Sequence, residues 1–499
     1  MEKENKALTY FKGLKNKNVT IVGIGVSNRP LIDLLLKYGA NITVCDKKSY
    51  EDLKPTAEFL AQKGVKLCLG DHYLDDLSGE IIFKTPGMRS DLPPFNAARA
   101  KGCLVTSEME VFFSLCPCRI IAVTGSDGKT TTTTLIYNFL KAQGFTCHLG
   151  GNIGKPLLPE IFNISYDHFA IVELSSFQLQ DMKDSPYIAV VTNVAPNHLD
   201  WHKSMDEYID AKRNIYKYQR HASRLTLNAD NKITVSFAKE ANGEVNWFSF
   251  KRRVLKGVYL NENGDIYHTC DSTHTYGVTD NAISENNDIL IMNRDIIKLQ
   301  GDHNVENYMA AISAVWGLCD IKNITEVAST FNGVEHRMEF IKEHNGVKYY
   351  NDSIATSPTR TIACLKSQKQ RIILIAGGYD KKVPFEPLAP YIAEKVKLLI
   401  LTGNTAGKIR EAVEKDAGYN SELLEIITVK NLDDAVSLAN ERAVKGDIVY
   451  LSPASASFDS FPNFEVRGVY FKDLVNSLGI NKIKRYNSNK NVTKEIKKE

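Results

Sequence analysis

A strand that ends in a glycine-rich turn followed by a lysine constrains the fold of this chain more than any other stretch. Residues 119–140 read RIIAVTGSDGKTTTTTLIYNFL, in which an apolar run stops at Gly125 and an apolar-periodic segment follows the lysine. A strand that leads through such a turn into a helix is typical of a parallel α/β sheet, and the amides at the start of the helix bind phosphate oxygens. The usual phosphate-loop signature has four residues between its glycines, whereas Ser126 and Asp127 alone separate Gly125 from Gly128.

The residues after this turn supply the other parts of a nucleotide site. Lys129 offers a charge to the β- and γ-phosphates, and the hydroxyl of Thr130, or of its neighbour Thr131, is placed to bind Mg²⁺. The alternative is a plain strand–turn–helix connection with an accidental lysine. Five consecutive threonines start a helix poorly, which weakens that alternative. We therefore predict nucleotide phosphate binding at a shortened loop.

Strands and helices alternate in three successive blocks. The first block has strands at residues 19–25 and 41–46, the second begins with the strand at 119–125, and the third begins near residue 333. Strands that alternate with helices predict parallel, doubly wound sheets. Ligands of such sheets bind beyond the carboxyl ends of the strands, so functional residues are expected there.

A polar stretch at residues 231–300 differs from these blocks, and its Asn263-Gly264 pair is a hairpin turn signal. The predicted fold is α/β in three consecutive domains. These are a Rossmann-like N-terminal domain, a central P-loop ATPase-type parallel sheet with an antiparallel edge layer, and a Rossmann-like C-terminal domain. The predicted bounds are 1–107, 108–332 and 333–485, followed by a flexible basic tail at 486–499.

Composition excludes several classes of partner. A net charge of +3 over 499 residues gives no argument for nucleic acid or a membrane surface. The nine cysteines lack the spacing of a disulfide framework, which indicates reduced thiols. No signal peptide and no apolar run of about eighteen residues is present. We expect a cytoplasmic monomer that does not insert into a membrane.

Acidic and histidine residues follow two further strands of the second block. Glu173 ends the apolar run 169–172 and is positioned as a second ligand for a phosphate-bound Mg²⁺. His198, and more weakly His202, follow the next strand and leave the sheet at the same edge. The alternatives are a carboxylate near a helix start and solvated loop histidines.

Lys212 interrupts the apolar face of a predicted helix at residues 205–217. One explanation is that its stem is buried while its ammonium group reaches water. The other is a desolvated amine, which loses its proton readily and can react with carbon dioxide to form a metal-binding carbamate. From the residues alone, we favour the first explanation.

The first block contains a degenerate dinucleotide motif. Gly23 and Gly25 follow the first strand, but Asn28 replaces the third glycine, and Asp46 ends the second strand about twenty residues later. The missing glycine argues against NAD, while Asp46 is placed to bind a ribose hydroxyl.

Polar clusters at strand ends in the third block predict part of a substrate cleft. The residues that we expect to line it are Arg337, Asp352, Thr356, Lys381 and Ser457.

Taken together, these motifs resemble the Mur ligases, the ATP-dependent amino-acid-adding enzymes of peptidoglycan synthesis. The segments TGSDGKTT, GGNIG, ELSSFQL, NHLDWH, GDHNVEN, HRME and NDS follow the order found in that family. The resemblance covers nearly the whole chain except residues 231–300 and the tail. ELSSFQL and SPASASFDSFPNFE are most similar to the members that add D-glutamate.

The resemblance implies a carboxylate–amine ligase that forms a C–N bond between UDP-N-acetylmuramoyl-L-alanine and D-glutamate. ATP phosphorylates the carboxylate, the amine attacks the acyl phosphate, and ADP and phosphate are released. It also implies two Mg²⁺ ions, one held by Thr130 and Glu173, the other by His198 and a carbamylated Lys212.

The remaining site residues are likewise implied by the resemblance. For ATP they are Gly125, Ser126, Asp127, Gly128, Lys129, Thr130, Thr131, Asn304, Asn307, Arg337 and Asp352. For the UDP substrate they are Ser27, Asn28, Asp46, Thr85 and Asn152. For D-glutamate they are Thr356, Lys381, Ser457 and Phe464.

Two positions depart from the family pattern. Asn197 stands where many relatives have Asp. Ile354 stands where they often have Lys, so a cation at that position is either missing or supplied by Arg360 or Lys382. The alternatives are a folylpolyglutamate synthase, which lacks the N-terminal block, a nicotinamide-dependent oxidoreductase, and a nucleotide-gated binding protein without chemistry.

Overall fold

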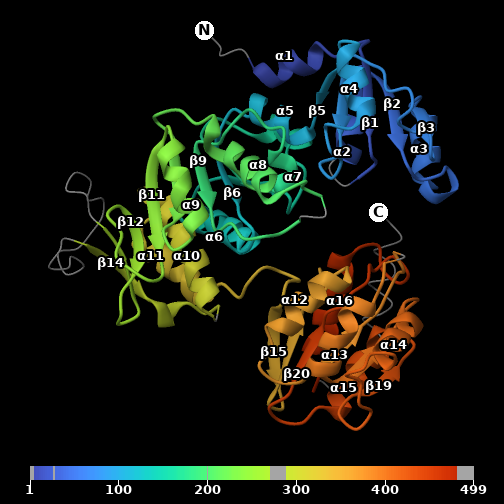
Figure 1. The fold of residues 1–499 in the computed structure, drawn as a ribbon, viewed down its shortest axis with the longest axis vertical. Coiled ribbons are helices and arrows are strands. Elements are labelled where there is room, and N and C mark those ends of the chain that lie inside the picture. The colour runs from blue at the N-terminus through green and yellow to red at the C-terminus, as the bar shows by residue number, and fades with distance from the viewer. Residues whose placement is uncertain are drawn as a thin grey trace. The chain divides into compact units, whose positions relative to one another are not determined.

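The computed structural model describes residues 5–25, 28–198, 201–269, 288–299, 301–381 and 383–479. Its helices and strands form three sheets that follow one another along the chain (Figure 1). Met1–Phe331 form one compact unit, which contains the first two sheets, and Asn332–Glu499 form the other. The α/β fold class with three sheet-based parts is confirmed. The predicted tail at 486–499 lies outside the described residues.

The first sheet is parallel throughout, with the strand order β3-β2-β1-β4-β5. Val19 and Ile21 of β1 pack with α1 to α3, whereas Val22 packs with Phe95 of α4 on the opposite face. The strand order reverses between β1 and β4, and ligands bind at such a switch point. The elements are α1 (Lys6–Lys12), β1 (Asn18–Val22), α2 (Asn28–Lys37), β2 (Asn41–Asp46), α3 (Thr56–Gln62), β3 (Lys66–Leu69), β4 (Ile81–Lys84), α4 (Pro93–Ala100) and β5 (Leu104–Thr106).

The second sheet has the order β14-β13-β12-β11-β10-β9-β6-β8-β7 and is parallel from β7 to β12. Helices α6, α10 and α11 cover one face, and α5, α8 and α9 pack on the other. The strands are β6 (Arg119–Thr124), β7 (Cys147–Gly151), β8 (Phe169–Glu173), β9 (Ile188–Val191), β10 (Arg224–Asn228), β11 (Glu244–Ser249), β12 (Gly257–Leu260), β13 (Asp265–His268) and β14 (Ile289–Asn293). The helices are α5 (Glu108–Leu115), α6 (Lys129–Ala142), α7 (Ser176–Leu179), α8 (Met205–Lys217), α9 (Lys232–Phe237), α10 (Asp302–Val315) and α11 (Ile321–Thr330).

The expected antiparallel layer at residues 231–300 is smaller than predicted. Its first part continues the parallel sheet, because α9 connects β10 to β11 and β12 pairs parallel with β11. Antiparallel pairing is limited, in the described part of this stretch, to β12–β13–β14. The hairpin at Asn263-Gly264 is confirmed between β12 and β13. The polar composition misled the prediction, because Phe248 of β11 is buried in spite of its polar neighbours in the sequence.

The five threonines lie inside α6 rather than before it. The hydroxyls of Thr133 and Thr134 donate to the carbonyls of Lys129 and Thr130, four residues earlier, both at 2.8 Å. Tertiary packing overrides the low helix propensity, since the apolar face of α6 is buried against the sheet.

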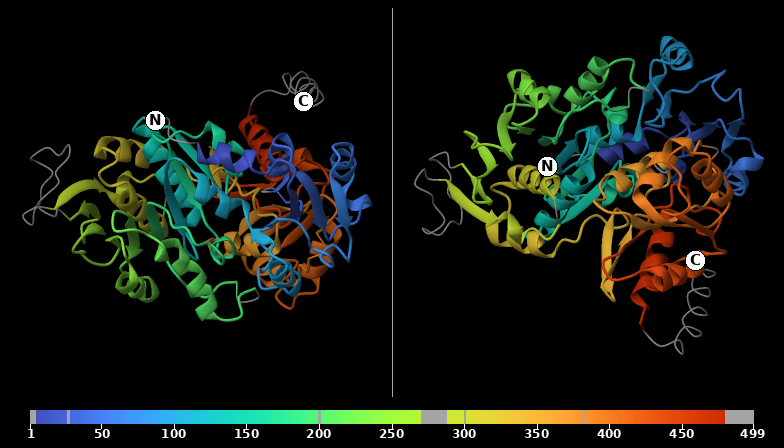
Figure 2. Two further views of the ribbon diagram at one scale, coloured as in Figure 1. Left: turned by 90° about the horizontal axis from the view of Figure 1, so that it is seen from above. Right: turned by 60° about the horizontal axis from the view of Figure 1, so that its bottom comes forward.

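The third sheet has the order β15-β16-β20-β17-β18-β19, and all pairs except β15–β16 are parallel. Helices α12 to α14 pack on one face and α15 and α16 on the other. Figure 2 shows this part of the chain in orange to red. Strands β15 and β19 are not apparent from the sequence, because both are partly exposed, β15 is rich in charge and β19 is only four residues long. The elements are β15 (Glu339–His344), β16 (Val347–Asn351), α12 (Pro358–Lys366), β17 (Ile372–Ala376), α13 (Ala389–Lys395), β18 (Val396–Leu401), α14 (Ala406–Glu414), β19 (Glu425–Thr428), α15 (Leu432–Arg442), β20 (Ile448–Leu451) and α16 (Phe464–Asn476).

None of the helices in the described ranges combines the length and apolar character of a membrane span.

A buried carboxyl group connects the start of α5 to the segment before β8. Glu108 is buried, and its Oε1 accepts a hydrogen bond of 2.7 Å from the backbone amide of Leu158. Burial raises the pKa of Glu108 to about 7, although the amides of Leu158 and Leu157 oppose this rise. Charging the group in the folded protein therefore costs about 3 kcal/mol relative to the unfolded chain.

We predict that Glu108→Gln removes a pH dependence of stability. The pKa of Glu108 is raised on folding, so its stabilising contribution is complete below about pH 4.5 and is lost as the pH rises through 7. Relative to the native chain, the variant gains melting temperature between pH 5 and pH 8 in thermal unfolding. Glu51→Gln, at an exposed position, is the control. A melting-temperature difference that is the same at both pH values contradicts the prediction.

Candidate active site

The predicted phosphate loop lies between the carboxyl end of β6 and the start of α6. Gly125 has φ of 152° and Gly128 has φ of 77°. A Cβ at Gly125 would overlap Thr192 Oγ1, and one at Gly128 would overlap Asn307 Oδ1. Both positions therefore require glycine, because the backbone there approaches its neighbours too closely for a side chain.

Side chains from the β9 exit hold the loop in place. The amide of Asp127 donates to Asn193 Oδ1 at 2.9 Å, and Thr192 Oγ1 donates to the Asp127 carbonyl at 2.6 Å. Ser126 Oγ lies 2.9 Å from the Tyr208 hydroxyl on α8. The sequence interpretation missed these residues. Thr192 and Asn193 directly follow a strand, and this position is a signal that could have identified them. Tyr208 carries no such signal, because in the sequence it looks like any other residue of an apolar helix face.

Lys129 is the first residue of α6, and its amine lies over the loop. Lys129 Nζ donates to the carbonyls of Gly125 at 2.9 Å and Ser126 at 2.8 Å. Thr130, the next residue, is buried in the first turn of the helix. A 14-residue helix that begins beside an ammonium group is suited to an anion.

The start of α10 contributes two asparagines beside this turn. Asn307 Oδ1 lies 3.4 Å from Thr132 Oγ1, and Asn307 Nδ2 lies 3.4 Å from Asn304 Oδ1. Because Asn307 also packs against Gly128, the fold brings the predicted residues Asn304 and Asn307 to the phosphate loop.

Glu173 ends β8 at the same sheet edge. Its register partner on β6 is Val123, two residues before Gly125. Glu173 is 1% exposed, its Oε1 accepts from Asn152 Nδ2 at 2.7 Å, and its buried Oε2 has no hydrogen-bond partner among the described residues. An unpartnered buried carboxylate oxygen beside a phosphate loop suits a Mg²⁺ ligand. Ser175 and Gln178 form a capping box on α7, so the capping alternative also holds and does not involve Glu173.

Lys212 is buried, so the snorkelling interpretation is wrong. It is 1% exposed, its Nζ donates to the Gly125 carbonyl at 2.8 Å and to Thr124 Oγ1 at 3.3 Å, and it lies 4.6 Å from the centre of the Tyr208 ring. Burial, assisted by the charge of Lys129, lowers the pKa of Lys212 well below its usual value. The helical face on which it lies packs against β6, so its amine is buried rather than extended into water.

The two histidines after β9 have different surroundings. His198 is exposed, with φ of 55°, and its ring centre is 5.0 Å from that of Phe177. His202 is buried, its Nε2 is 2.9 Å from Ser176 Oγ, and burial lowers its pKa. His202 is therefore a packing residue, whereas His198 faces outward.

Within the described ranges, no three His, Cys, Asp or Glu side chains are grouped to bind a metal. Mg²⁺ binds through one or two carboxylates together with hydroxyls and phosphate oxygens. Glu173 and Thr130 fit this pattern, and a metal there would depend on the nucleotide for its remaining ligands.

The carboxyl ends of β1, β2 and β4 bring together three of the predicted UDP residues, Asn28, Asp46 and Thr85, whereas Asn152 follows β7 of the second sheet and bonds to Glu173. Asp46 Oδ2 accepts from the Ile24 amide at 2.7 Å, and a Cβ at Gly23 would contact the side chain of Thr85. Asn28 is buried, and its Nδ2 donates to the Gly23 carbonyl at 3.0 Å, so it holds the turn. Ser27 lies outside the described residues.

The third sheet brings together part of its predicted cluster. Lys381 Nζ donates to the Thr356 carbonyl at 3.3 Å. Asp352 is buried, accepts from Ser452 Oγ at 2.7 Å, and burial raises its pKa to about 6. Arg337 is exposed, whereas Ser457 is buried.

Phe464 begins α16, and its carbonyl accepts from Ser353 Oγ at 2.8 Å. Arg467, on the same helix, was missed in the sequence. It is buried and donates to Ser353 Oγ at 3.0 Å and to the Ser455 carbonyl at 3.1 Å. It also borders a cavity of about 230 Å³ at the exits of β17 and β18, and no pattern around an arginine in an apolar helix indicates such a role.

The two positions that depart from the family pattern have local contacts. Asn197 Oδ1 accepts from the His198 amide at 2.9 Å. Arg360 donates to the Ile354 carbonyl at 3.1 Å, so a cation does lie beside this position. Lys382 lies outside the described residues.

The sheet order, the shortened phosphate loop and the buried acid at the next strand exit define an ATP-dependent ligase of the Mur type. Residues 123–315 match the Mur ligase middle domain, and residues 336–455 match the Mur ligase glutamate ligase domain. With the relatives described next, these matches establish that the chain belongs to the Mur ligase family.

Several similar proteins are named UDP-N-acetylmuramoylalanine–D-glutamate ligase. That of Acetivibrio thermocellus is 53% identical over 472 residues, which cover 94% of this chain and 98% of the relative. That of Clostridium kluyveri is 51% identical over 466 residues, covering 93% and 98%, and that of Clostridium novyi is 49% identical over 483 residues, covering 95% and 100%.

Solved structures support the fold. The UDP-N-acetylmuramate-alanine ligase MurC of Thermotoga maritima has a TM-score of 0.53 at 17% identity, covering 93% of this chain and 100% of that one. MurF of Acinetobacter baumannii has a TM-score of 0.51 at 14% identity, covering 93% and 92%.

We predict that Gly128→Ala weakens ATP binding about tenfold or more, because the new Cβ overlaps Asn307 Oδ1 and the backbone is left-handed. Isothermal titration calorimetry with a non-hydrolysable ATP analogue measures the change. Gly407→Ala is the control, since a Cβ there meets no atom within 4 Å. Unchanged affinity in Gly128→Ala contradicts the loop geometry.

Proposed function

We propose that this Mur ligase joins D-glutamate to UDP-N-acetylmuramoyl-L-alanine, and that it acts as a monomer in the cytoplasm. The reaction passes through an acyl phosphate and releases ADP and phosphate. The observation that carries the proposal is the Oε2 of buried Glu173, which lies beside the phosphate loop and has no hydrogen-bond partner in the described part of the chain. The name shared by relatives 48% to 53% identical over nearly their full lengths supports the choice of substrates.

The chain's own groups suit the two steps of this reaction. The start of α6 and Lys129 would bind and neutralise the phosphates of ATP, and Asn304 and Asn307 would border the nucleotide. Thr130 and Glu173 would hold Mg²⁺, which supplies charge neutralisation at the transferred phosphoryl group. Most of the catalysis would then come from positioning and electrostatics.

The other proposed contacts to the substrates come from residues near the carboxyl ends of strands. Asp46 and Thr85 would contact the uridine nucleotide together with Ser27, while Asn28 would act by holding the turn. Asn152, which is bonded to Glu173, would face the muramoyl group. Arg337 and Asp352 would contact ATP. The residues that would surround D-glutamate are Thr356, Lys381, Ser457 and Phe464.

Phosphate release from ATP and Mg²⁺ tests the reaction. With UDP-N-acetylmuramoyl-L-alanine and a panel of D- and L-amino acids, we expect release with D-glutamate alone. Glu173→Gln should lower the rate about a hundredfold or more, because it removes the carboxylate charge at the phosphoryl group. Asp167→Asn, before the same strand, is the control. Release with another amino acid overturns the choice of substrate, and no release with any of them overturns the proposed reaction.

We further propose that Lys212 carries a carbamate, which would hold a second Mg²⁺ with His198. The uncharged amine would add to carbon dioxide with loss of one proton, forming an N–C bond and a carboxylate. The burial of Lys212 and the lowering of its pKa support this reaction, since only the neutral amine is nucleophilic.

We predict a carbamate signal in the ¹³C NMR spectrum of the protein after incubation with ¹³C-bicarbonate at pH 8. Lys212→Met should abolish the signal, whereas Lys217→Met, on the same helix but exposed, should retain it. A spectrum without the signal in the native chain contradicts carbamylation, as does a signal that persists in Lys212→Met.

A further inference from the structure

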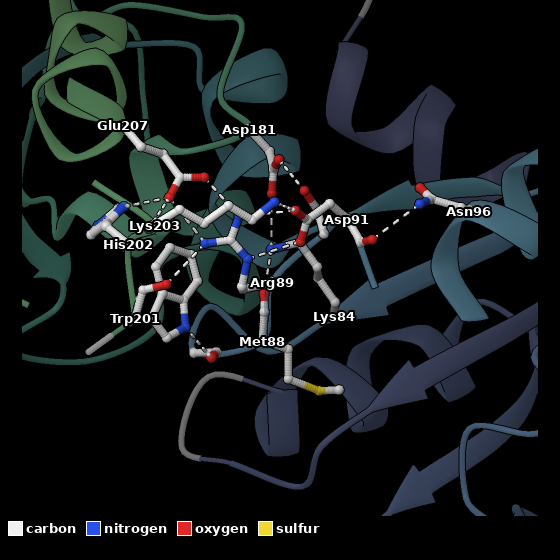
Figure 3. Close-up of polar contacts among 12 residues, drawn as sticks. Lys84, Met88, Arg89, Asp91, Asn96, Asp181, Trp201, His202, Lys203 and Glu207 are labelled. Carbon is white, nitrogen blue, oxygen red and sulfur yellow. Dashed lines mark hydrogen bonds and ion pairs between the residues drawn. The ribbon is translucent and has the colours of Figure 1, made fainter. Parts of the chain in front are cut away.

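An arginine on the first sheet bonds to the segment that carries His198. Arg89 lies on the connection between β4 and α4. Its guanidinium donates to the Trp201 carbonyl at 2.9 Å and to both carboxylate oxygens of Glu207, at 2.7 and 3.2 Å (Figure 3). Such a bidentate contact fixes orientation as well as distance.

Aromatic and backbone contacts add to these bonds. Together they form a junction between the β4–α4 connection and residues 201–207. Trp201 Nε1 donates to the Gly87 carbonyl at 2.9 Å, and the guanidinium lies 5.0 Å from the centre of the Trp201 ring. Asp91 accepts from Arg89 Nε at 2.9 Å and from Lys203 Nζ at 2.7 Å. The β4–α4 connection and the segment after His198 therefore hold each other by several independent contacts.

A second ion pair lies beside the first. Lys84, the last residue of β4, is buried, and its Nζ lies 3.0 Å from Asp181 Oδ2. Ser90 Oγ donates to Asp181 Oδ1 at 2.5 Å. Figure 3 shows these side chains from the first two sheets converging on one another.

On the side of the second sheet, the junction contacts the elements that carry two candidate active-site residues, His198 and Lys212. The His198 carbonyl accepts from the amides of Trp201 at 3.1 Å and His202 at 3.0 Å, so His198 bonds to the residue whose carbonyl Arg89 binds. Glu207 lies in the first turn of α8, which one turn later presents Lys212 to the phosphate loop.

The junction reaches the predicted UDP site on the other side. Thr85, which packs beside Gly23, lies four residues before Arg89. The Thr85 carbonyl accepts from the Met88 amide at 3.1 Å, so a turn of four residues connects the two positions. A ligand that orders this turn would also order Arg89.

The ion pair between Arg89 and Glu207 is shielded from solvent, so it can contribute to the stability of the junction. The side chains of Arg89 and Glu207 are 18% and 20% exposed, unlike those of Lys203 and Asp91, which are 70% and 43% exposed. Exposed pairs contribute little, whereas shielded bidentate pairs are screened less by salt. Lysine lacks the planar fork and cannot reproduce both bonds to Glu207 and the bond to Trp201.

We propose that Arg89 is a positioning residue, through which the ligand site of the first sheet orders His198 and the start of α8 for the ligase reaction. The proposal rests on the proposed function for the identity of that ligand. Arg89 acts through the Trp201 carbonyl and the Glu207 carboxylate and does not itself contact the reacting atoms.

Hydrogen–deuterium exchange of the ligand-free chain provides the first test. Arg89→Ala should make the amides of residues 201–207 exchange about tenfold faster, and Arg89→Lys should give an intermediate increase. Lys203→Ala removes the exposed pair with Asp91 but keeps the Arg89 contacts, so its exchange should match the native chain. Native exchange rates in Arg89→Ala overturn the proposal.

Ligand coupling provides the second test. Adding UDP-N-acetylmuramoyl-L-alanine to the native chain should slow exchange at residues 201–207, and this protection should be lost in Arg89→Ala while protection near Asp46 remains. The Mg²⁺ concentration for half-maximal phosphate release should rise about fivefold in Arg89→Ala, with the KM for D-glutamate unchanged.

The outcomes separate the two hypotheses. Faster exchange in ligand-free Arg89→Ala with no phosphate release by the native enzyme supports the junction and counts against the proposed function. Substrate protection at residues 201–207 that survives in Arg89→Ala, or an equal loss in Lys203→Ala, overturns the role of Arg89.

Discussion

The pairing of β6 with β8 is the constraint on which the rest of the active site depends. Its register sets Val123 opposite Glu173, so a carboxylate emerges beside the turn that begins at Gly125. A slip of one residue would turn Glu173 to the other face of the sheet. β9, on the other side of β6, adds Thr192 and Asn193 at the same edge, and α10 adds Asn307.

This arrangement buries two titratable side chains around the phosphate loop. Glu173 keeps one oxygen without a hydrogen bond from any described residue, and Lys212 is buried under the loop with its amine hydrogen-bonded to neutral oxygens. Such groups are costly in a folded protein unless a ligand or a modification compensates them. Two such groups, on two elements around one phosphate loop, are not explained by packing alone and therefore indicate a functional site.

Local sequence signals predicted much of the fold. The alternation of strands and helices gave the α/β class, and Asn263-Gly264 gave the hairpin. Propensity failed for the threonines of α6, because burial of the helix face outweighs it. Polarity failed at residues 231–300, because β11 and β12 extend a parallel sheet in spite of polar neighbours. Strand β15 has the charge of a surface segment and β19 is only four residues long, so both are specified by their pairing partners.

The sequence by itself determined the phosphate loop, the acid after β8 and the membership of the Mur ligase family, because these depend on residue types at fixed short spacings. Only the tertiary structure decided that Lys212 is buried, that Asn28 holds a turn, that His202 packs in the interior, and that Arg89 meets Trp201 and Glu207. The physical reason is that burial and ion pairing depend on which elements pack together. Arg89 lies 112 positions from Trp201 and 118 from Glu207, and no local sequence signal marks such a contact.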